Sequence, residues 1–136
     1  EGNEEIALEY AKGLFNLSNK QEEAGAKGSV SRLEELSGKY EGNEEIALEY
    51  AKGLFNLSCD QEEAGAKESV SRLEELSGKY EGNEEIALAY AKGLFILSCN
   101  QDESKRRTSL KRLDELRKKY KLVDEWFIEF FRNLNK

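Results

Sequence analysis

Residues 41–80 read EGNEEIALEYAKGLFNLSCDQEEAGAKESVSRLEELSGKY, and close copies of this stretch stand on both sides of it. Residues 1–40 differ from it only at Asn19/Cys59, Lys20/Asp60 and Gly28/Glu68, whereas residues 81–120 differ at 14 positions, mostly in their second half. Tandem copies with a period of about 20 to 50 residues are typical of repeat proteins, whose neighbouring units bury each other's apolar faces. The chain is therefore expected to form one stacked array.

The first half of each copy has the pattern of a helix covered on more than one face. Asn3 is a credible N-cap, and Glu4 and Glu5 complement the helix dipole, so this helix is expected to begin near Glu4. Its apolar residues point at many angles around the helix, which places it between two other helices. They are Ile6, Ala7, Leu8, Tyr10, Ala11, Leu14, Phe15 and Leu17.

The second half of each copy has the pattern of an outer helix. The polar segment 19–28, with Gly25 and Gly28, is expected to hold the turn and a frayed helix start. A single apolar stripe follows, as expected for a helix with one covered face. It consists of Val30, Leu33, Leu36 and Tyr40, and the Glu41, Gly42, Asn43 junction then ends this helix and caps the next.

Composition predicts an all-α protein. The 136 residues include no Pro, His or Met, and helix formers dominate. No apolar run reaches the roughly 18 residues of a membrane span, and the sequence EGNEEIALEY lacks the pattern of an export signal. Cys59 and Cys99 occupy equivalent places in successive repeats, about 10 Å apart by helix-packing distances, beyond the reach of a disulfide. Two free thiols and a cytoplasmic location are expected, with intermolecular pairing as the alternative.

No pattern of catalytic or ligand-binding chemistry is found. Adjacent acids such as Glu4/Glu5, Glu22/Glu23 and Glu34/Glu35 point about 100° apart on a helix, so they are interpreted as solvated surface. Without His, a Ser or Cys nucleophile lacks its usual base, and two separated thiols do not make a zinc site. We therefore predict no enzyme activity and no catalytic, cofactor-binding or metal-binding residues.

The C-terminal segment aligns with the start of a fourth repeat. Aligning Tyr120 with Tyr40 lays residues 124–134 over residues 44–54, with small residues replaced by aromatic ones. A repeat array needs a terminal element that closes its apolar stack against water. The predicted capping residues are Trp126, Phe127, Phe130 and Phe131, and a membrane-binding or partner-binding helix is the alternative interpretation.

This two-helix unit resembles the tetratricopeptide repeat family, with Ala7, Tyr10, Ala11 and Leu14 on the family's core positions. The period of 40 residues differs from the family's period of about 34. The resemblance implies an α-solenoid, a right-handed superhelix of 3.5 repeats and about seven helices. Its units would be repeat 1 at 1–40, repeat 2 at 41–80, repeat 3 at 81–120 and a capping half repeat at 121–136, all in one solenoid domain.

The same resemblance implies a concave surface on the first helix of each repeat, where extended peptides or helices dock. Lys12/Asn16 and Lys52/Asn56 match pairs with which some members hold a peptide's C-terminal carboxylate, a pattern that Ala89 and Ile96 interrupt in repeat 3. The alternative is that the apolar members belong to the core and the polar ones face water. The implied groove residues are Glu5, Leu8, Lys12, Phe15, Asn16, Glu45, Leu48, Lys52, Phe55, Asn56, Glu85, Leu88, Lys92 and Phe95.

Charge is unevenly distributed. Residues 1–100 hold 10 Lys and Arg against 21 Asp and Glu, net −11, whereas residues 101–136 hold 11 against 7, net +4. The basic stretch 105–121 would suit nucleic acid, but it lacks interleaved aromatic residues, so a solvated helix is the preferred interpretation.

The favoured function is a non-catalytic scaffold that binds a protein or peptide through the groove. Repeat 1 copies an interior repeat from its first residue, so its leading face is expected to be uncovered and to favour homo-oligomers. The alternatives are an engineered or structural array whose role is folding or self-assembly, and a nucleic-acid-binding protein that uses the basic helix of repeat 3. Nothing in the sequence names the partner.

Overall fold

The computed structural model describes residues 2–20 and 22–134 of the chain, and these form seven helices and no strand. The prediction of an all-α protein with about seven helices is therefore confirmed. The helices are α1 (Gly2–Lys20), α2 (Glu23–Lys39), α3 (Glu44–Asp60), α4 (Glu63–Lys79), α5 (Glu84–Cys99), α6 (Glu103–Lys119) and α7 (Lys121–Leu134).

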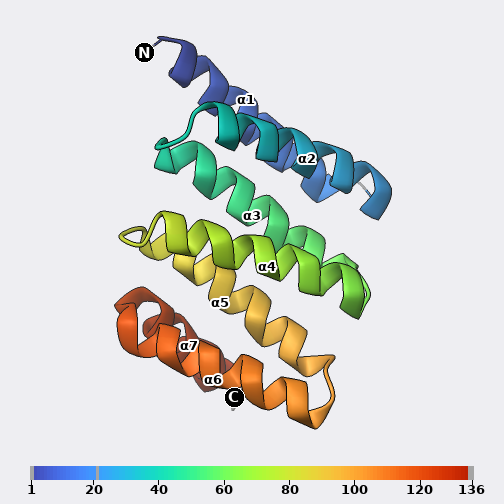
Figure 1. Ribbon diagram of the computed structural model, residues 1–136, viewed down its shortest axis with the longest axis vertical. Coiled ribbons are helices and arrows are strands. Elements are labelled where there is room, and N and C mark those ends of the chain that lie inside the picture. Colours follow the sequence, from blue (N-terminus) through green and yellow to red (C-terminus); the bar gives the residue numbers. More distant parts are fainter. Residues whose placement is uncertain (1, 21, 135–136) are drawn as a thin grey trace.

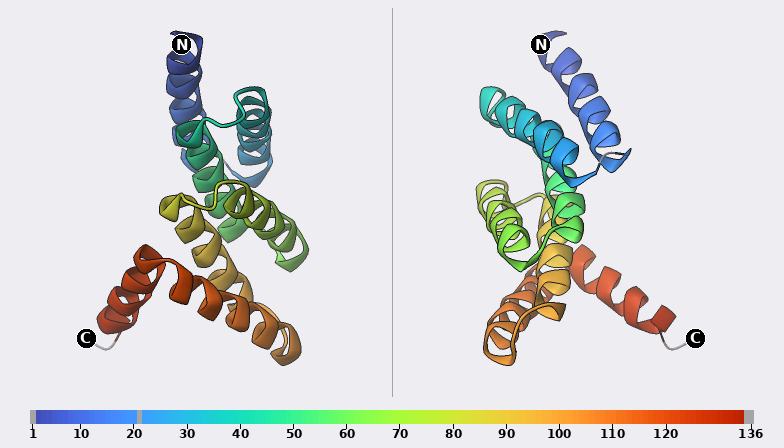
Figure 2. Two further views of the ribbon diagram at one scale, coloured as in Figure 1. Left: turned by 60° about the vertical axis from the view of Figure 1, so that its left-hand side comes forward. Right: turned by 90° about the vertical axis from the view of Figure 1, so that its right-hand side faces the viewer.

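The helices stack in two layers (Figures 1 and 2). We call α1, α3, α5 and α7 the inner layer and α2, α4 and α6 the outer layer. Each inner helix packs against the next inner helix, and each outer helix packs against the inner helices that precede and follow it. The inner helices therefore have neighbours on two sides, as their many-faced apolar pattern predicts.

The core lies between the two layers and between successive inner helices. In α3, Ile46, Ala47 and Ala51 are fully buried, and Tyr50 is 5% exposed. On α4 the buried residues form one stripe, as expected for an outer helix: Val70, Leu73, Leu76 and, just after the helix, Tyr80. Small residues at 47 and 51 let adjacent inner helices approach closely, and the larger side chains fill the space beside them.

The junction between α2 and α3 confirms the predicted capping residue. Gly42 has a φ of +93°, a conformation that costs glycine little, and it reverses the chain after Tyr40. The side chain of Asn43 then accepts a hydrogen bond of 3.0 Å from the amide of Ile46. Asn83 caps α5 in the same way, at 2.9 Å from the amide of Ile86.

The expected N-cap at Asn3 is wrong. α1 includes both Gly2 and Asn3, so Asn3 lies inside the helix. Asn43 is held in its extended capping conformation by the preceding turn, in which its amide donates to the carbonyl of Tyr40 at 3.0 Å. No helix of the described chain precedes Asn3, so no such turn draws it out of helical geometry.

The turn between the two helices of a repeat is shorter than predicted. α2 begins at Glu23, so Gly25 and Gly28 lie in regular helix rather than in a polar turn or a frayed end. The buried Ala26 anchors this first part of α2, and its packing offsets the weak helix preference of two glycines. In repeat 3 the first turn also gains a side-chain cap, because Asp102 accepts from the amide of Lys105 at 3.0 Å.

α7 takes the place of a fourth inner helix but starts differently. It packs against α5 and α6, as α3 packs against α1 and α2. The glycine and asparagine of the earlier junctions are replaced by Leu122 and Val123, and the helix begins directly after Tyr120. Glu84 of α5 accepts from the free amide of Leu122 at 3.0 Å, which satisfies one donor at the start of α7.

Side-chain hydrogen bonds and ion pairs connect each repeat to the next. Along the outer layer Arg72 contacts Glu34 at 2.5 Å, and Arg112 contacts Glu74 in the equivalent pair one repeat later. At the junctions, Asn43 donates to Glu4 at 2.8 Å. Glu4 and Glu34 were expected to be merely solvated. They are exposed, but they also hydrogen-bond to the following repeat.

Candidate functional site

The inner layer carries an open cavity of about 430 Å³, which we call the inner groove. It extends over α1, α3, α5 and the start of α7. Eight of the predicted groove residues line it, together with Ala89 and Leu122, which were not predicted as groove residues. Its lining is Phe15, Leu48, Lys52, Phe55, Asn56, Glu85, Leu88, Ala89, Lys92 and Leu122.

The remaining predicted residues lie elsewhere on the inner layer. Leu8 and Phe95 are half-buried against the core. The exposed members of the set do not line the cavity; they are Glu5, Lys12, Asn16 and Glu45. The groove therefore begins between repeats 1 and 2 rather than extending over the whole of α1.

Lysine ammonium groups alternate with aromatic rings along the groove. The Nζ of Lys52 lies 4.8 Å from the centre of the Phe15 ring, in the preceding repeat. The Nζ of Lys92 lies 5.7 Å from the Phe55 ring and 5.1 Å from the ring of Trp126 on α7. These cation–π contacts hold each lysine stem across the boundary between two repeats.

The three equivalent lysines have different electrostatic environments. Lys12 lies 3.7 Å from Glu9, and Lys52 lies 3.0 Å from Glu49. Ala89 replaces this acid in repeat 3, and among the described residues no carboxylate pairs with Lys92. Burial lowers the pKa of Lys92 below that of an ordinary lysine, because its ammonium is partly withdrawn from water without a compensating charge. Lys92 is therefore the lysine that gains most from an external anion.

The asparagines of the predicted carboxylate-binding pairs also have different surroundings in the two repeats. Asn56 donates its side-chain amide to the Asn19 side chain, so this amide already has a partner within the protein. Asn16 is exposed and lies outside the groove. Ile96 replaces the amide in repeat 3. The geometry therefore favours Lys92 alone, rather than the lysine and asparagine pairs of repeats 1 and 2, as an anion contact.

The aromatic residues of α7 lie at the C-terminal end of the groove. Phe127 is 1% exposed, and its ring meets that of Phe95 edge to face with centres 5.5 Å apart. Trp126 stacks on Phe130 at 5.1 Å. Phe131 remains 42% exposed, so it covers less of the stack than the other three predicted capping residues. In Figure 2 the C-terminal half of α7 points away from α5 and α6.

The first helix has the uncovered face that the repeat pattern indicates. Ile6 is 71% exposed, whereas its equivalent Ile46 is fully buried. Tyr10, assigned to a core position by the family resemblance, is 47% exposed, whereas Tyr50 is 5% exposed. These side chains have no preceding helix to pack against in the described chain. Self-association through α1 stays a prediction.

The basic stretch 105–121 forms α6 and the start of α7, and acids pair with much of it. Lys105 lies 3.6 Å from Glu63, and Lys119 lies 3.3 Å from Glu81. Arg117 bonds Asp124 of α7 at 2.9 Å. Phosphates would have to compete with these carboxylates, so the groove is the stronger candidate site.

Comparisons with known proteins give no assignment. No protein-family model matches the sequence, and neither the curated proteins nor the solved structures give a match.

Cys59 and Cys99 are both free and exposed. Across residues 2–20 and 22–134, no helix combines the length and the apolar character that crossing a bilayer requires.

Proposed function

We propose that the chain is a right-handed, tetratricopeptide-like α-solenoid that binds an extended protein or peptide segment in the inner groove, without catalysis. Two features support this proposal: the continuous layer of inner helices, and a groove whose walls come from successive repeats. The solenoid form would present one set of groove side chains per repeat to a partner chain.

The environment of Lys92 is the observation that supports the proposal most strongly. It is half-buried between the rings of Phe55 and Trp126, without an acid partner among the described residues. A partly desolvated ammonium in an apolar setting binds a carboxylate more strongly than an exposed one does, because solvent screens it less. The energetic cost of partly burying the Lys92 ammonium without a carboxylate among the described residues would be recovered when a partner binds.

The groove also indicates the character of the partner. Leu48, Leu88 and Phe55 offer half-buried apolar surface next to Lys92. A matching segment would place a carboxylate, either its C-terminus or an acidic side chain, beside a bulky apolar side chain. The overall charge of −7 disfavours strongly acidic partners, so a single carboxylate is preferred over an acidic run.

The test uses short extended peptides that end in Leu or Phe, with a free C-terminal carboxylate or with an amide in its place. Trp126 is the chain's one tryptophan and lies beside Lys92, so its fluorescence reports occupancy of the groove. Lys92→Gln is expected to weaken carboxylate peptides about tenfold or more, the scale of one charge-assisted hydrogen bond. Amidated peptides should be affected far less.

Lys52→Gln is the matched control. It removes the equivalent lysine one repeat earlier, whose charge Glu49 already neutralises at 3.0 Å. We expect a smaller loss of affinity from it than from Lys92→Gln. Equal losses in the two variants would contradict the role of Lys92. If no peptide saturates the groove, the proposal is wrong, and the alternatives are an array whose role is structural or a nucleic-acid-binding protein that uses α6.

A further inference from the structure

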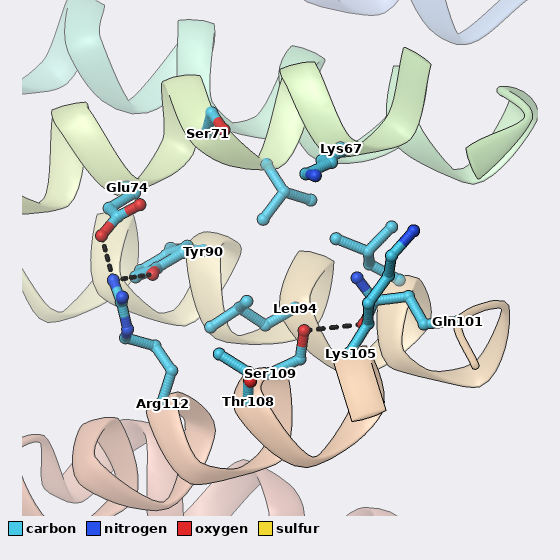
Figure 3. Close-up of a pocket in the computed structure, with 12 residues that line it drawn as sticks. Lys67, Ser71, Glu74, Tyr90, Leu94, Gln101, Lys105, Thr108, Ser109 and Arg112 are labelled. Carbon is cyan, nitrogen blue, oxygen red and sulfur yellow. Dashed lines mark hydrogen bonds and ion pairs between the residues drawn. The ribbon is translucent and has the colours of Figure 1, made fainter. Parts of the chain in front are cut away.

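The outer layer contains a second kind of cavity, on the side of the molecule opposite the inner groove. One copy lies between α4, α5 and α6 and measures about 290 Å³; we call it the α4–α6 cavity (Figure 3). Its apolar floor includes Tyr90, Leu94 and Leu97. The same arrangement recurs one repeat earlier between α2, α3 and α4, with a volume of about 200 Å³; we call it the α2–α4 cavity.

The two cavities form an internal comparison, because their linings correspond residue by residue at a shift of 40. Only two of the lining positions differ. Lys105 of the α4–α6 cavity corresponds to Gly65, and Thr108 corresponds to Glu68. Both belong to the group of substitutions that sets repeat 3 apart from repeat 2.

These two substitutions change the charge of the rim. The α2–α4 cavity has the cations Lys27 and Arg72 against the acids Glu34 and Glu68, which cancel. The α4–α6 cavity has the cations Lys67, Lys105 and Arg112 against the single acid Glu74, net +2. Counted over the lining residues, the α4–α6 cavity is therefore cationic where the α2–α4 cavity is neutral, and the two have the same apolar floor.

The contacts at the rim show that fewer carboxylates neutralise the arginine of the α4–α6 cavity than the arginine of the α2–α4 cavity. In the α2–α4 cavity, Arg72 is bonded to Glu34 at 2.5 Å and to Glu68 at 3.2 Å. Both arginines contact the tyrosine of the preceding inner helix, Arg72 with Tyr50 and Arg112 with Tyr90. Thr108 replaces the second acid in the α4–α6 cavity, so Glu74 is the one carboxylate of the lining that bonds Arg112. One of the two carboxylates that neutralise the guanidinium is thus lost.

Figure 3 shows the cations at two ends of the cavity. Arg112 stands at one end with Glu74 and Tyr90, and the stems of Lys67 and Lys105 rise from α4 and α6 at the other. Lys105 also lies 3.6 Å from Glu63, in an exposed and therefore weak ion pair with which a ligand carboxylate would compete. No ion pair engages Lys67 among the described residues. The apolar floor lies between the two ends.

We propose that the α4–α6 cavity is a binding site for a small monocarboxylate with an apolar tail. The tail lies over Tyr90, Leu94 and Leu97, and the carboxylate lies between Lys67 and Lys105, since Glu74 already occupies Arg112 at the other end. A volume of about 290 Å³ equals that of about ten waters at roughly 30 Å³ each, which suits a ligand of about ten heavy atoms. The site is separate from the inner groove.

Octanoate is the probe. Calorimetry should give saturable binding in the millimolar range or tighter with one site per chain, and the NMR signals of Tyr90, Leu94 and Leu97 should shift. Uncharged 1-octanol should bind about tenfold or more weakly, because it lacks the charge-assisted contact. Added salt should weaken octanoate and leave octanol unchanged, because it screens the exposed ammonium groups.

The internal comparison supplies the decisive variants. The double substitution Lys105→Gly with Thr108→Glu rebuilds the rim of the α2–α4 cavity, and it should weaken octanoate about tenfold or more while octanol binding stays the same. The reciprocal pair, Gly65→Lys with Glu68→Thr, should add a site for a shorter carboxylate such as pentanoate, because the α2–α4 cavity of about 200 Å³ suits about seven heavy atoms. Each substitution places a residue that the neighbouring repeat already carries, and circular dichroism checks the helix content.

Three results would overturn the proposal. The first is octanoate binding that the rim exchange does not weaken. The second is two equivalent sites in the unmodified chain. The third is no saturation in the millimolar range, which would show that the cavity is an ordinary gap between outer helices.

Discussion

At the scale of single residues, identical sequence has different consequences in successive repeats. Gly53 of α3 lies where an added Cβ would be 3.1 Å from Leu33 and 3.3 Å from Val30, both on α2. Gly93 makes the same close approach to Leu73 and Val70. Gly13, the equivalent in α1, meets nothing within 4 Å. The glycine therefore allows close helix packing in repeats 2 and 3, and in repeat 1 it only weakens the helix.

This contrast yields a stability prediction. Gly13→Ala should raise the free energy of unfolding by up to about 1 kcal/mol, because alanine is the better helix former and no neighbour obstructs it. Gly53→Ala gains the same helix preference but has to displace the Leu33 and Val30 methyl groups, so it should stabilise less or destabilise. Urea denaturation of the two variants measures the difference. Equal stabilisation would contradict the close approach at Gly53.

Only part of this residue-level detail was predictable from the sequence. The alanines at 7, 11, 47 and 51 were identifiable as packing positions, and all four are buried. The packing role of Gly53 was not identified, since its closest neighbours lie about 20 residues earlier, on another helix. In the sequence, the electrostatic difference between Lys52 and Lys92 is visible only as the replacement of Glu49 by Ala89, which by itself indicates a break in the binding pattern.

At the scale of helices, the junctions decide where each element begins. Asn43 caps α3 and also donates to Glu4 of α1, so it orders its own helix and connects two repeats. Asn3 has the same sequence neighbours but lies within α1. Capping therefore depends on the preceding turn as well as on the asparagine.

Asn43→Ala and Asn3→Ala form a matched pair that tests this dependence. Loss of the Asn43 cap should lower the free energy of unfolding by about 1 to 2 kcal/mol, because it leaves the Ile46 amide without its partner. Asn3→Ala should change stability by no more than a few tenths of a kcal/mol in the same assay. A loss of similar size in both variants would mean that Asn3 also acts as a cap.

The helix types were predictable, but some of the boundaries were not. Apolar periodicity indicated both layers, because burial requires a stripe on one face or on several. The start of α7 at Lys121 was not predictable, because it depends on a hydrogen bond from the Leu122 amide to the Glu84 carboxylate of α5, which is far away in sequence. Similarly, α2 tolerates Gly25 and Gly28 because tertiary packing outweighs local preference.

At the scale of the whole molecule, the repeats are joined by a core between the layers and by arginine–glutamate ion pairs along the outer face. Tyr50 and Tyr90 belong to both features. Each is nearly buried under the outer layer and faces the arginine of the following outer helix. Burial is the main cause that raises the pKa of both tyrosines above the usual value of 10.0.

These tyrosines predict a loss of stability at alkaline pH. Below pH 10 both the folded and the unfolded chain keep the phenolic proton, so the contribution is fully present. Above that pH the unfolded chain loses the proton first, because its pKa is lower, and the free energy of unfolding falls as pH rises through the folded pKa. In urea denaturation measured between about pH 8 and pH 11, this contribution should therefore lower the midpoints only above about pH 10.

The double variant Tyr50→Phe with Tyr90→Phe isolates this contribution. Phenylalanine fills the same space without a titrating group, so the decline above pH 10 should be shallower than in the unmodified chain. Lys92 acts in the opposite direction, because its lowered pKa makes the folded state more stable as the ammonium loses its proton. An unchanged slope in the double variant would rule out the tyrosines as its source.

The sequence alone was sufficient to predict the helical class and the apolar faces of the helices, because hydrophobic periodicity is a local property of the chain. Tertiary structure decided where the charges meet. Three features depend on side chains brought together from different helices. They are the setting of Lys92 between two rings, with no carboxylate partner among the described residues, the different rims of the two outer cavities, and the cap that Glu84 provides for α7. Copies of one sequence acquire different properties in this protein because each copy has different neighbours.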